Sequence, residues 1–169
     1  SVHMYSQSRC KVVWNEESQR FLPGEYPQDA VSVGACNGTD GLQASVTEAL
    51  AAGETAATES CPKAKKSGVK IAVDGEGKWA GNMVGAGPGA GAGEVVKAFV
   101  DFQNDVTAKD IRLAVREGMR SIEHVKRYTT TGMGTDQGKT ANVNALANIA
   151  QTLGVEIPSL GVTTFRPPY

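Results

Sequence analysis

Short apolar runs mark the beginning of the chain. Residues 12–14 (Val-Val-Trp) and 20–22 (Arg-Phe-Leu) flank the polar stretch 15–18, which is the pattern of two short strands joined by a turn. Residues 30–35 (Ala-Val-Ser-Val-Gly-Ala) are apolar enough to predict a buried strand that runs into a glycine-containing turn. The start of the chain is therefore expected to be mainly β-structure.

Apolar residues then recur at helical spacing. Leu42, Val46 and Leu50 lie four residues apart among small alanines, which predicts a helix over residues 39–58. Further on, the apolar run 69–73 (Val-Lys-Ile-Ala-Val) has the composition of one short strand.

The second half of the chain begins with an extended run and then becomes helical. Residues 97–102 are predicted to be extended. Thr107, with Asp110 three residues later, resembles a capping box in which Asp replaces the usual Glu. We therefore expect a helix over residues 108–117, and Gly118 is a natural residue to end it.

Two more helices are expected after that one. Ser121 is a good N-cap for a short helix that continues to Lys126. A third helix is predicted over residues 139–152, ending before Gly154. Its periodic apolar positions, which we expect to be buried, are Val143, Ala145, Leu146, Ile149 and Leu153.

The middle of the chain has the composition of a linker. Residues 62–68 are charged and polar, and residues 81–93 are rich in glycine, which loses much backbone entropy on ordering. We predict one domain over residues 1–61, a linker over 62–94 and a second domain over 95–169. The expected fold class is α+β.

Composition limits the classes of function. The 169 residues include 40% apolar and 21% charged residues, and 17 basic against 18 acidic side chains give a net charge of −1. This balance disfavours nucleic-acid binding, and no apolar run reaches the roughly 20 residues of a membrane helix. Three cysteines without a Cys-x-x-Cys pair indicate cytoplasmic thiols. The chain lacks the pattern of a signal peptide and reads as a piece of a longer polypeptide.

Single motifs carry little chemistry. The glycines of 81–93 alternate strictly and do not fit the dinucleotide motif GxGxxG. The end of residues 132–140 resembles a phosphate loop, but Met133 stands where the Walker pattern needs glycine. Gly138, Lys139 and Thr140 can still hold an anion if they open a helix. His124 has no partner at ligand spacing, so a structural role is the simpler interpretation.

A family resemblance rests on four stretches of the second half. Residues 97–107, 120–130, 132–139 and 163–169 read KAFVDFQNDVT, RSIEHVKRYTT, GMGTDQGK and TTFRPPY. Together they closely resemble the alpha subunit of heterotetrameric sarcosine oxidases, over essentially all of residues 96–169. The resemblance implies a small helical domain between a pyridine-nucleotide-binding domain and a folate-binding, aminomethyltransferase-like domain.

The first part of the chain is similar to the end of that nucleotide-binding domain. There a strand, a glycine turn and a helix close over the cofactor, and residues 31–51 correspond to them here. Related flavoenzymes place Gly-Asp at this turn, whereas this chain has Gly34-Ala35, which suits NAD rather than FAD. The resemblance implies that the residues lining an NAD pocket are Ala35, Asp40 and Leu42, with Gly34 and Thr39 as weaker candidates.

The helical domain also resembles the ferredoxin-like domains of amine and opine dehydrogenases, which bind a 2Fe–2S cluster through four cysteines. Alignment puts the four ligand positions at Asp101, Gln103, Asp136 and Ala141, none of which is cysteine. Thiolates hold such clusters, so we expect no iron–sulfur cluster and no metal ligands here. The alternative is an electron-transfer domain that does carry a 2Fe–2S cluster, and a second alternative is a stand-alone nucleotide-binding module.

The family also implies an activity for the whole enzyme. It would oxidise sarcosine to glycine, transfer the methyl carbon to tetrahydrofolate or release formaldehyde, and produce hydrogen peroxide. Its beta, gamma and delta subunits are the expected partners, with FAD in the beta subunit and FMN between alpha and beta. This chain would scaffold domains, wall flavin and NAD sites, and carry no catalytic residue. The residues expected to contact the FMN phosphate are Lys126, Arg127, Thr129, Thr130 and Lys139.

Overall fold

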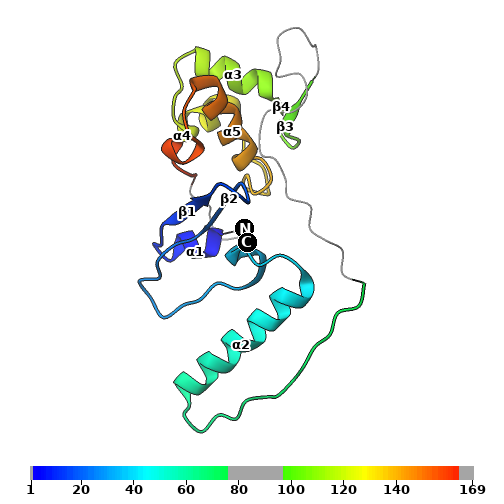
Figure 1. Cartoon of the computed structure of the whole chain (residues 1–169). Coiled ribbons are helices and arrows are strands. Elements are labelled where there is room, and N and C mark those ends of the chain that lie inside the picture. The colour runs from blue at the N-terminus through cyan, green and yellow to red at the C-terminus, as the bar shows by residue number, and fades with distance from the viewer. Residues whose placement is uncertain (1, 76–96, 164–169) are drawn as a thin grey trace. The chain divides into compact units, whose positions relative to one another are not determined.

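The computed structural model describes residues 2–75 and 97–163. The chain divides into two compact units, Ser1–Asn82 and Met83–Tyr169, which we describe separately (Figure 1). Both combine helices with a two-stranded sheet, so the α+β class is confirmed. The predicted boundary near residue 94 and the glycine-rich stretch lie outside the described residues. No helix within the described ranges has the length and apolar character that crossing a membrane requires.

The first unit begins with helix α1 (His3–Gln7) and a hairpin of β1 (Val12–Asn15) and β2 (Arg20–Pro23). The strands pair antiparallel, with Asn15 opposite Arg20, as the apolar runs predicted. Asn15 Oδ1 accepts hydrogen bonds from the Ser18 amide and hydroxyl, which fixes the turn between the strands. Trp14 and Phe21 face each other across the hairpin with ring centroids 4.9 Å apart.

The buried strand predicted over residues 30–35 is wrong. Residues 30–33 form no regular element, Val31 is 64% exposed, and Gly34–Asn37 forms the short 3₁₀ helix η1. The Ser32 amide donates to the Tyr26 hydroxyl instead of to a neighbouring strand. An apolar run becomes a strand only where a partner supplies the ladder, and none of the described residues does so here.

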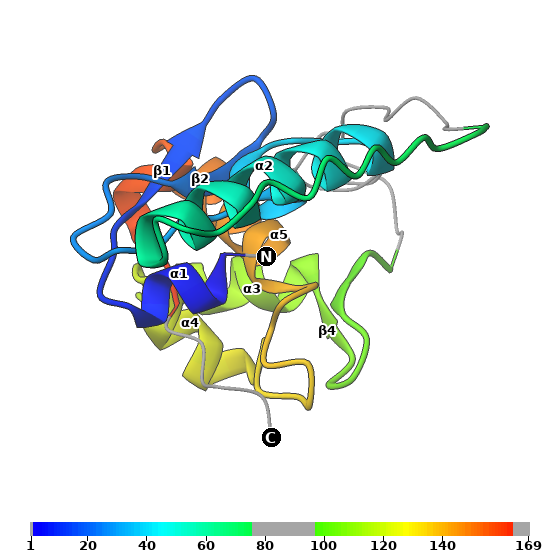
Figure 2. The same ribbon diagram turned by 90° about the horizontal axis from the view of Figure 1, so that it is seen from below.

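The long helix α2 (Leu42–Ser60) is the predicted helix, shifted by two to three residues, but it buries none of its side chains. After it, residues 69–73 form no strand, so that prediction is also wrong. They lie extended beside α2 (Figure 2), where Gln43 Nε2 donates to the Ile71 carbonyl and Gln43 Oε1 accepts from the Val73 amide. One side chain thus bonds the backbone groups that a second strand would have paired.

The second unit is a three-helix cluster with a short hairpin. Strands β3 (Phe99–Asp101) and β4 (Val106–Thr107) pair antiparallel. Helix α3 (Ala108–Arg116) packs against α4 (Ile122–Thr129) and α5 (Asn142–Leu153), and the short helix η2 (Ile157–Leu160) follows α5 (Figure 1).

Most helix ends follow the sequence signals, although α4 continues to Thr129, three residues beyond the predicted end at Lys126. The predicted capping box is present, because the Thr107 side chain and the Asp110 backbone and side chain satisfy each other. Ser121 Oγ accepts from the His124 amide at the start of α4, and Gly118 and Gly154 have the positive φ of helix-terminating residues. Helix α5 starts at Asn142, three residues later than predicted, because residues 134–141 form turns.

The apolar core belongs to the second unit. Ile111, Val125 and Ile149 are fully buried there, and Ala114 and Ala145 allow the helices to approach closely. Two of the predicted core positions of α5, Val143 and Leu153, are only half-buried. Within residues 2–75, the buried apolar side chains are Tyr5 and Cys10.

Candidate functional site

The five residues predicted to line an NAD pocket meet in one turn of the first unit, between η1 and the start of α2. Gly34 is buried, Thr39 and Asp40 are half-buried, Ala35 is exposed, and Leu42 is 60% exposed. Gly34, Gly38 and Gly41 all have positive φ, which lets the chain turn tightly between η1 and α2. The turn therefore leaves Ala35 and Leu42 exposed and keeps Thr39 and Asp40 partly covered.

A carboxylate from α2 accepts a hydrogen bond from the backbone of this turn. Glu48 Oε2 accepts from the Gly34 amide at 2.7 Å, and Glu48 Oε1 accepts from Asn37 Nδ2 at 2.7 Å. The bond from the Gly34 amide is the main cause that lowers the pKa of Glu48. A glycine amide of the kind that can bind a phosphate is thus already paired within the chain.

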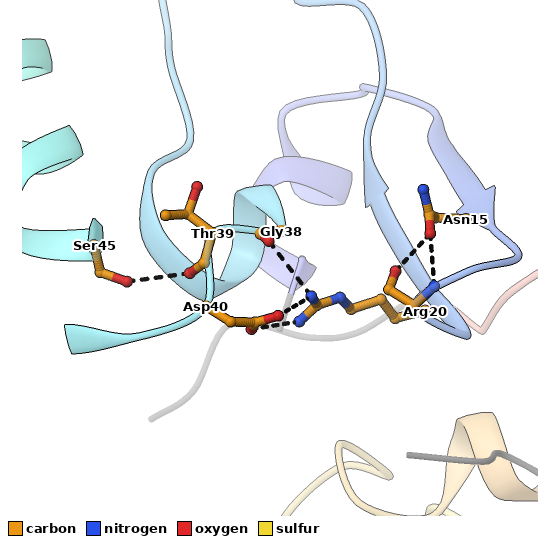
Figure 3. A network of polar contacts seen from close by, with 7 residues as sticks. Asn15, Arg20, Gly38, Thr39, Asp40 and Ser45 are labelled. Atoms are coloured by element: carbon orange, nitrogen blue, oxygen red, sulfur yellow. Dashed lines mark hydrogen bonds and ion pairs between the residues drawn. The ribbon is translucent and has the colours of Figure 1, made fainter. Parts of the chain in front are cut away.

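Asp40 is held by an arginine from the hairpin (Figure 3). Both Asp40 carboxylate oxygens accept from the guanidinium of Arg20, and Arg20 Nη2 also approaches the Gly38 carbonyl. This pairing lowers the pKa of Asp40 and raises that of Arg20. Next to it, the Ser45 hydroxyl donates to the Thr39 carbonyl. The pair of Arg20 and Asp40 thus joins β2 to the turn before α2.

The turn offers limited chemistry in this arrangement. Asp40 keeps lone pairs that could accept from a ribose hydroxyl, since a carboxylate has about four acceptor sites and Arg20 uses two. Ala35 and Leu42 can supply an apolar wall. The residues fit one edge of a nucleotide pocket, and they do not fit a complete phosphate site.

A buried carboxylate organises the second unit. Asp101 is 3% exposed and ends β3. Its Oδ1 accepts from the amides of Gln103 and Asn104 at 2.9 and 3.1 Å, which closes the turn between β3 and β4. Its Oδ2 accepts from the Gly132 amide at 2.7 Å, in the loop between α4 and α5. Asp101 therefore joins two loops that are 31 residues apart in the sequence.

Two further contacts join the same loops. Gln103 Nε2 donates to Thr135 Oγ1 at 2.7 Å, and Asn104 Nδ2 donates to the Thr130 carbonyl at 3.1 Å. We call these contacts, with the bond from Asp101 to Gly132, the Asp101 clasp. Two of the aligned cluster-ligand positions, Asp101 and Gln103, are thus hydrogen-bonded to the loop that contains the third.

The third aligned position, Asp136, caps the turns before α5. Its carboxylate accepts from the Gly138 amide, the Thr140 amide and the Thr140 hydroxyl. The bond from the Thr140 side chain is the largest of the causes that lower the pKa of Asp136. The fourth position, Ala141, is buried immediately before α5. No group of three or more His, Cys, Asp or Glu within the described residues is arranged to hold a metal ion.

The anion site predicted at residues 138–140 already has partners within the chain. The Lys139 amide donates to the Asp136 carbonyl, and Asp136 takes the amides on either side. An incoming anion would have to displace a carboxylate that the chain itself supplies. Side chains, rather than backbone amides, are what this loop can offer to a phosphate.

The structure places the five residues predicted to contact FMN along α4 and the loop after it. Arg127 pairs with Glu123 on the exposed surface, an arrangement that an incoming anion can disrupt at small cost. Thr129 Oγ1 donates to the Val125 carbonyl and bonds Thr131. Lys126 and Lys139 are half-buried. Thr130 has φ +66° although it is β-branched, and its carbonyl is held by Asn104.

Asn142 is a structural residue that the sequence analysis missed. It is 4% exposed, and its Nδ2 donates to Thr163 Oγ1 at 2.6 Å. Its carboxamide fills the space in which a Cβ at Gly132 or Gly138 would stand. Both glycines also have positive φ. The first and last glycines of GMGTDQG are thus the sequence signal of a loop that folds tightly around a buried side chain.

Comparison with known proteins gives one consistent result. Residues 95–169 match the family model described as the sarcosine oxidase A3 domain. Over 172 residues, the chain is 44% identical to the sarcosine oxidase subunit alpha of Rhizobium meliloti (strain 1021), which covers 99% of this chain and 17% of that protein. The corresponding subunits of Corynebacterium sp. strains P-1 and U-96 are 34% and 36% identical, again over 99% of this chain and 18% of their own length. The chain thus spans less than a fifth of these relatives.

Proposed function

Because this chain belongs to the family of sarcosine oxidase alpha subunits, we propose that it forms part of an enzyme that demethylates sarcosine oxidatively. With oxygen and water, sarcosine would give glycine, formaldehyde and hydrogen peroxide, or the methyl carbon would pass to tetrahydrofolate. The relatives are named as subunits, which implies an enzyme of several chains. Beta, gamma and delta subunits are the partners we propose.

In this proposal the second unit is a scaffold without a cluster. The observation that carries it is the Asp101 clasp, since Asp101 accepts from the Gly132 amide and Gln103 donates to the Thr135 hydroxyl of the facing loop. Oxygen and amide groups in such bonds are not the thiolates that hold iron–sulfur clusters. Residues 95–169 also contain no cysteine. Direct hydrogen bonds would do here what the metal cluster does in ferredoxin-like domains, which is to tie the two loops together.

The last turns of α4 and the loop after it would help to wall an FMN site between subunits. When bound, the flavins would supply the redox chemistry of the enzyme. Lys126, Arg127 and Lys139 would hold the phosphate through their charges, because the backbone amides around Lys139 are already engaged. The exposed pair of Arg127 with Glu123 would open to release the guanidinium for this contact.

The first unit would contribute one edge of an NAD pocket. Ala35 and Leu42 would form an apolar wall, and Asp40, held by Arg20, would face the ribose with its remaining lone pairs. The phosphates would lie against other parts of the subunit, because Glu48 already bonds the Gly34 amide.

Replacement of cations in the assembled enzyme tests the flavin role. Arg127→Ala together with Lys139→Ala should lower FMN content per enzyme by about tenfold or more, since phosphate contacts are charge-assisted hydrogen bonds. Sarcosine-dependent peroxide formation should fall in parallel. The matched control is Lys109→Ala with Arg116→Ala, which removes two exposed cations from α3. Equal FMN content in both double variants would refute the role of the loop.

Iron analysis of the same enzyme tests the scaffold role. We expect neither iron nor acid-labile sulfide in proportion to the alpha subunit. About two atoms of each per subunit would instead support the electron-transfer alternative, in which this domain carries a 2Fe–2S cluster.

A further inference from the structure

Two large apolar side chains extend from the loops that the Asp101 clasp joins. Phe102 is 79% exposed and Met133 is 50% exposed. Phe99, which is 37% exposed, lies beside Phe102 with ring centroids 6.0 Å apart. We call these three residues the Phe102 patch.

The clasp makes Phe102 and Met133 neighbours. Phe102 stands between Asp101 and Gln103, and Met133 stands between Gly132 and Gly134. Asp101 bonds the Gly132 amide, and the Gln103 side chain lies so close to Gly134 that a Cβ there would overlap it. The two exposed residues therefore occupy facing positions between two points of contact.

The turn that carries Phe102 is held rigidly. The buried Asp101 carboxylate accepts three backbone amides, two from the turn itself and one from the facing loop. Because the backbone of this turn is already held, docking of the exposed Phe102 ring would cost little additional backbone entropy. Aromatic anchors of this kind dominate the energy of protein interfaces.

The connections of the unit indicate what covers the patch. The chain enters the described part of the second unit at Lys97, whose Nζ lies 5.6 Å from the centre of the Phe99 ring. It leaves at Thr163, which accepts from Asn142. Asn142 in turn fills the space beside Gly132, next to Met133. Lys97 thus begins the described part of the unit beside the Phe102 patch, and Thr163 ends it beside Asn142, which lies against the loop that carries Met133.

More than four-fifths of the length of the related subunits lies outside the region that this chain matches. A segment tethered close to a surface has a high effective concentration there, so it binds before a separate chain does. We propose that the Phe102 patch docks into an apolar recess of the same alpha subunit, in a part that lies outside these 169 residues.

Photo-crosslinking in the assembled enzyme tests the identity of the occupant. Phe102 is replaced by p-benzoylphenylalanine in the full-length alpha subunit, and the crosslinked peptides are identified by mass spectrometry. The matched control carries the same group at Gln151, which is exposed at the end of α5. We expect position 102 to give peptides of the alpha subunit from outside this chain. Peptides from another subunit, from this chain itself, or no protein adduct would each overturn the proposal.

Oxidation of the unmodified enzyme gives a second test that needs no variant. Hydrogen peroxide converts exposed methionine to the sulfoxide, and burial slows this reaction. In the native full-length subunit, Met133 should be oxidised about tenfold more slowly than in the urea-unfolded subunit. A rate within twofold of the unfolded rate would mean that the patch stays open to water, and docking would be refuted.

Discussion

Each of the two units is stabilised internally by a different kind of contact. The second packs three helices around fully buried side chains such as Ile111 and Ile149, and its polar clasp is added to that core. The first has a 19-residue helix with no buried residue. Polar contacts join its elements, such as the Gly24 amide to the Tyr5 hydroxyl and the Arg20 guanidinium to the Asp40 carboxylate. Apolar burial is the main favourable contribution to folding, so the second unit has its own source of stability and the first has little.

The largest expected difference between the units is in the stability that a matched apolar substitution costs each of them. Ile111→Ala removes a fully buried side chain and should lower the free energy of unfolding of the second unit by about 2–5 kcal/mol. The matched change in the first unit, Leu42→Ala, removes a side chain that is 60% exposed and should cost less than about 0.5 kcal/mol. Both values can be measured by urea unfolding in which hydrogen exchange reports on each unit separately. Similar losses would show that the burial difference does not control stability.

The glycines of the loop allow a sharper test within the second unit. Gly138→Ala should cost about 2–4 kcal/mol, because its Cβ would overlap the buried carboxamide of Asn142 and its φ is +76°. Gly154→Ala has a similar φ, +67°, but nothing lies near the added Cβ, so it should cost about 1–2 kcal/mol. The difference in urea midpoint isolates the steric contribution. Equal midpoints would mean that Asn142 moves aside freely.

The Asp101 clasp should contribute less than the core on which it rests. Asp101→Asn replaces one acceptor oxygen by a donor, which leaves a buried amide unpaired and should cost about 1–3 kcal/mol. Asp105→Asn, in the same turn, is the control. Asp105 is exposed with φ +52°, a conformation that asparagine tolerates, so its stability should not fall. Protection of the Gly132 amide from exchange should be lost in the first variant and kept in the second.

Local signals predict the second unit well because its helices are capped by residues that are adjacent in the sequence. The Thr107–Asp110 capping box, the Ser121 cap and the terminal Gly118 all act within four residues, and all are present. The sequence pattern predicts the start of α5 three residues too early, because Asp136 accepts from the amides of Gly138 and Thr140 in turns that precede the helix. A side chain that competes with the helix for amides is hard to recognise from spacing alone.

The first unit was harder to predict, since its apolar runs do not meet the partners that the pattern implies. Residues 30–35 and 69–73 have strand composition, and no described strand pairs with either. The candidate site divides in the same manner. The resemblance grouped Gly34, Asp40 and Leu42 in one turn, as the structure does, whereas the bonds from Glu48 and Arg20 come from residues whose spacing gave no signal. Whether that turn binds NAD stays a prediction.

The smallest of the predicted effects is that of acid, which should weaken the polar contacts of the first unit. Hydrogen bonds from Arg20 and from the Gly34 amide lower the pKa values of Asp40 and Glu48 in the folded chain. The folded form therefore binds protons less readily than the unfolded form, whose carboxyls titrate near pH 4. The stabilisation is fully present above that pH and is lost as the pH falls through the lowered folded values.

Hydrogen exchange of the Gly34 and Thr39 amides, both hydrogen-bonded in this turn, measures this effect between pH 6 and pH 2.5 after correction for the intrinsic rate. We expect protection to fall at the acid end in the native chain and to depend less on pH in Asp40→Asn, which cannot lose a charge. Asp29→Asn, an exposed position in the same unit, should behave as the native chain does. The buried helix α5 should keep its protection in all three, because Ile149 and Ala145 are held by apolar contacts that do not titrate. If α5 lost protection at the same pH as Gly34, the two units would unfold as one, and the contrast between a core and a polar network would not describe this chain.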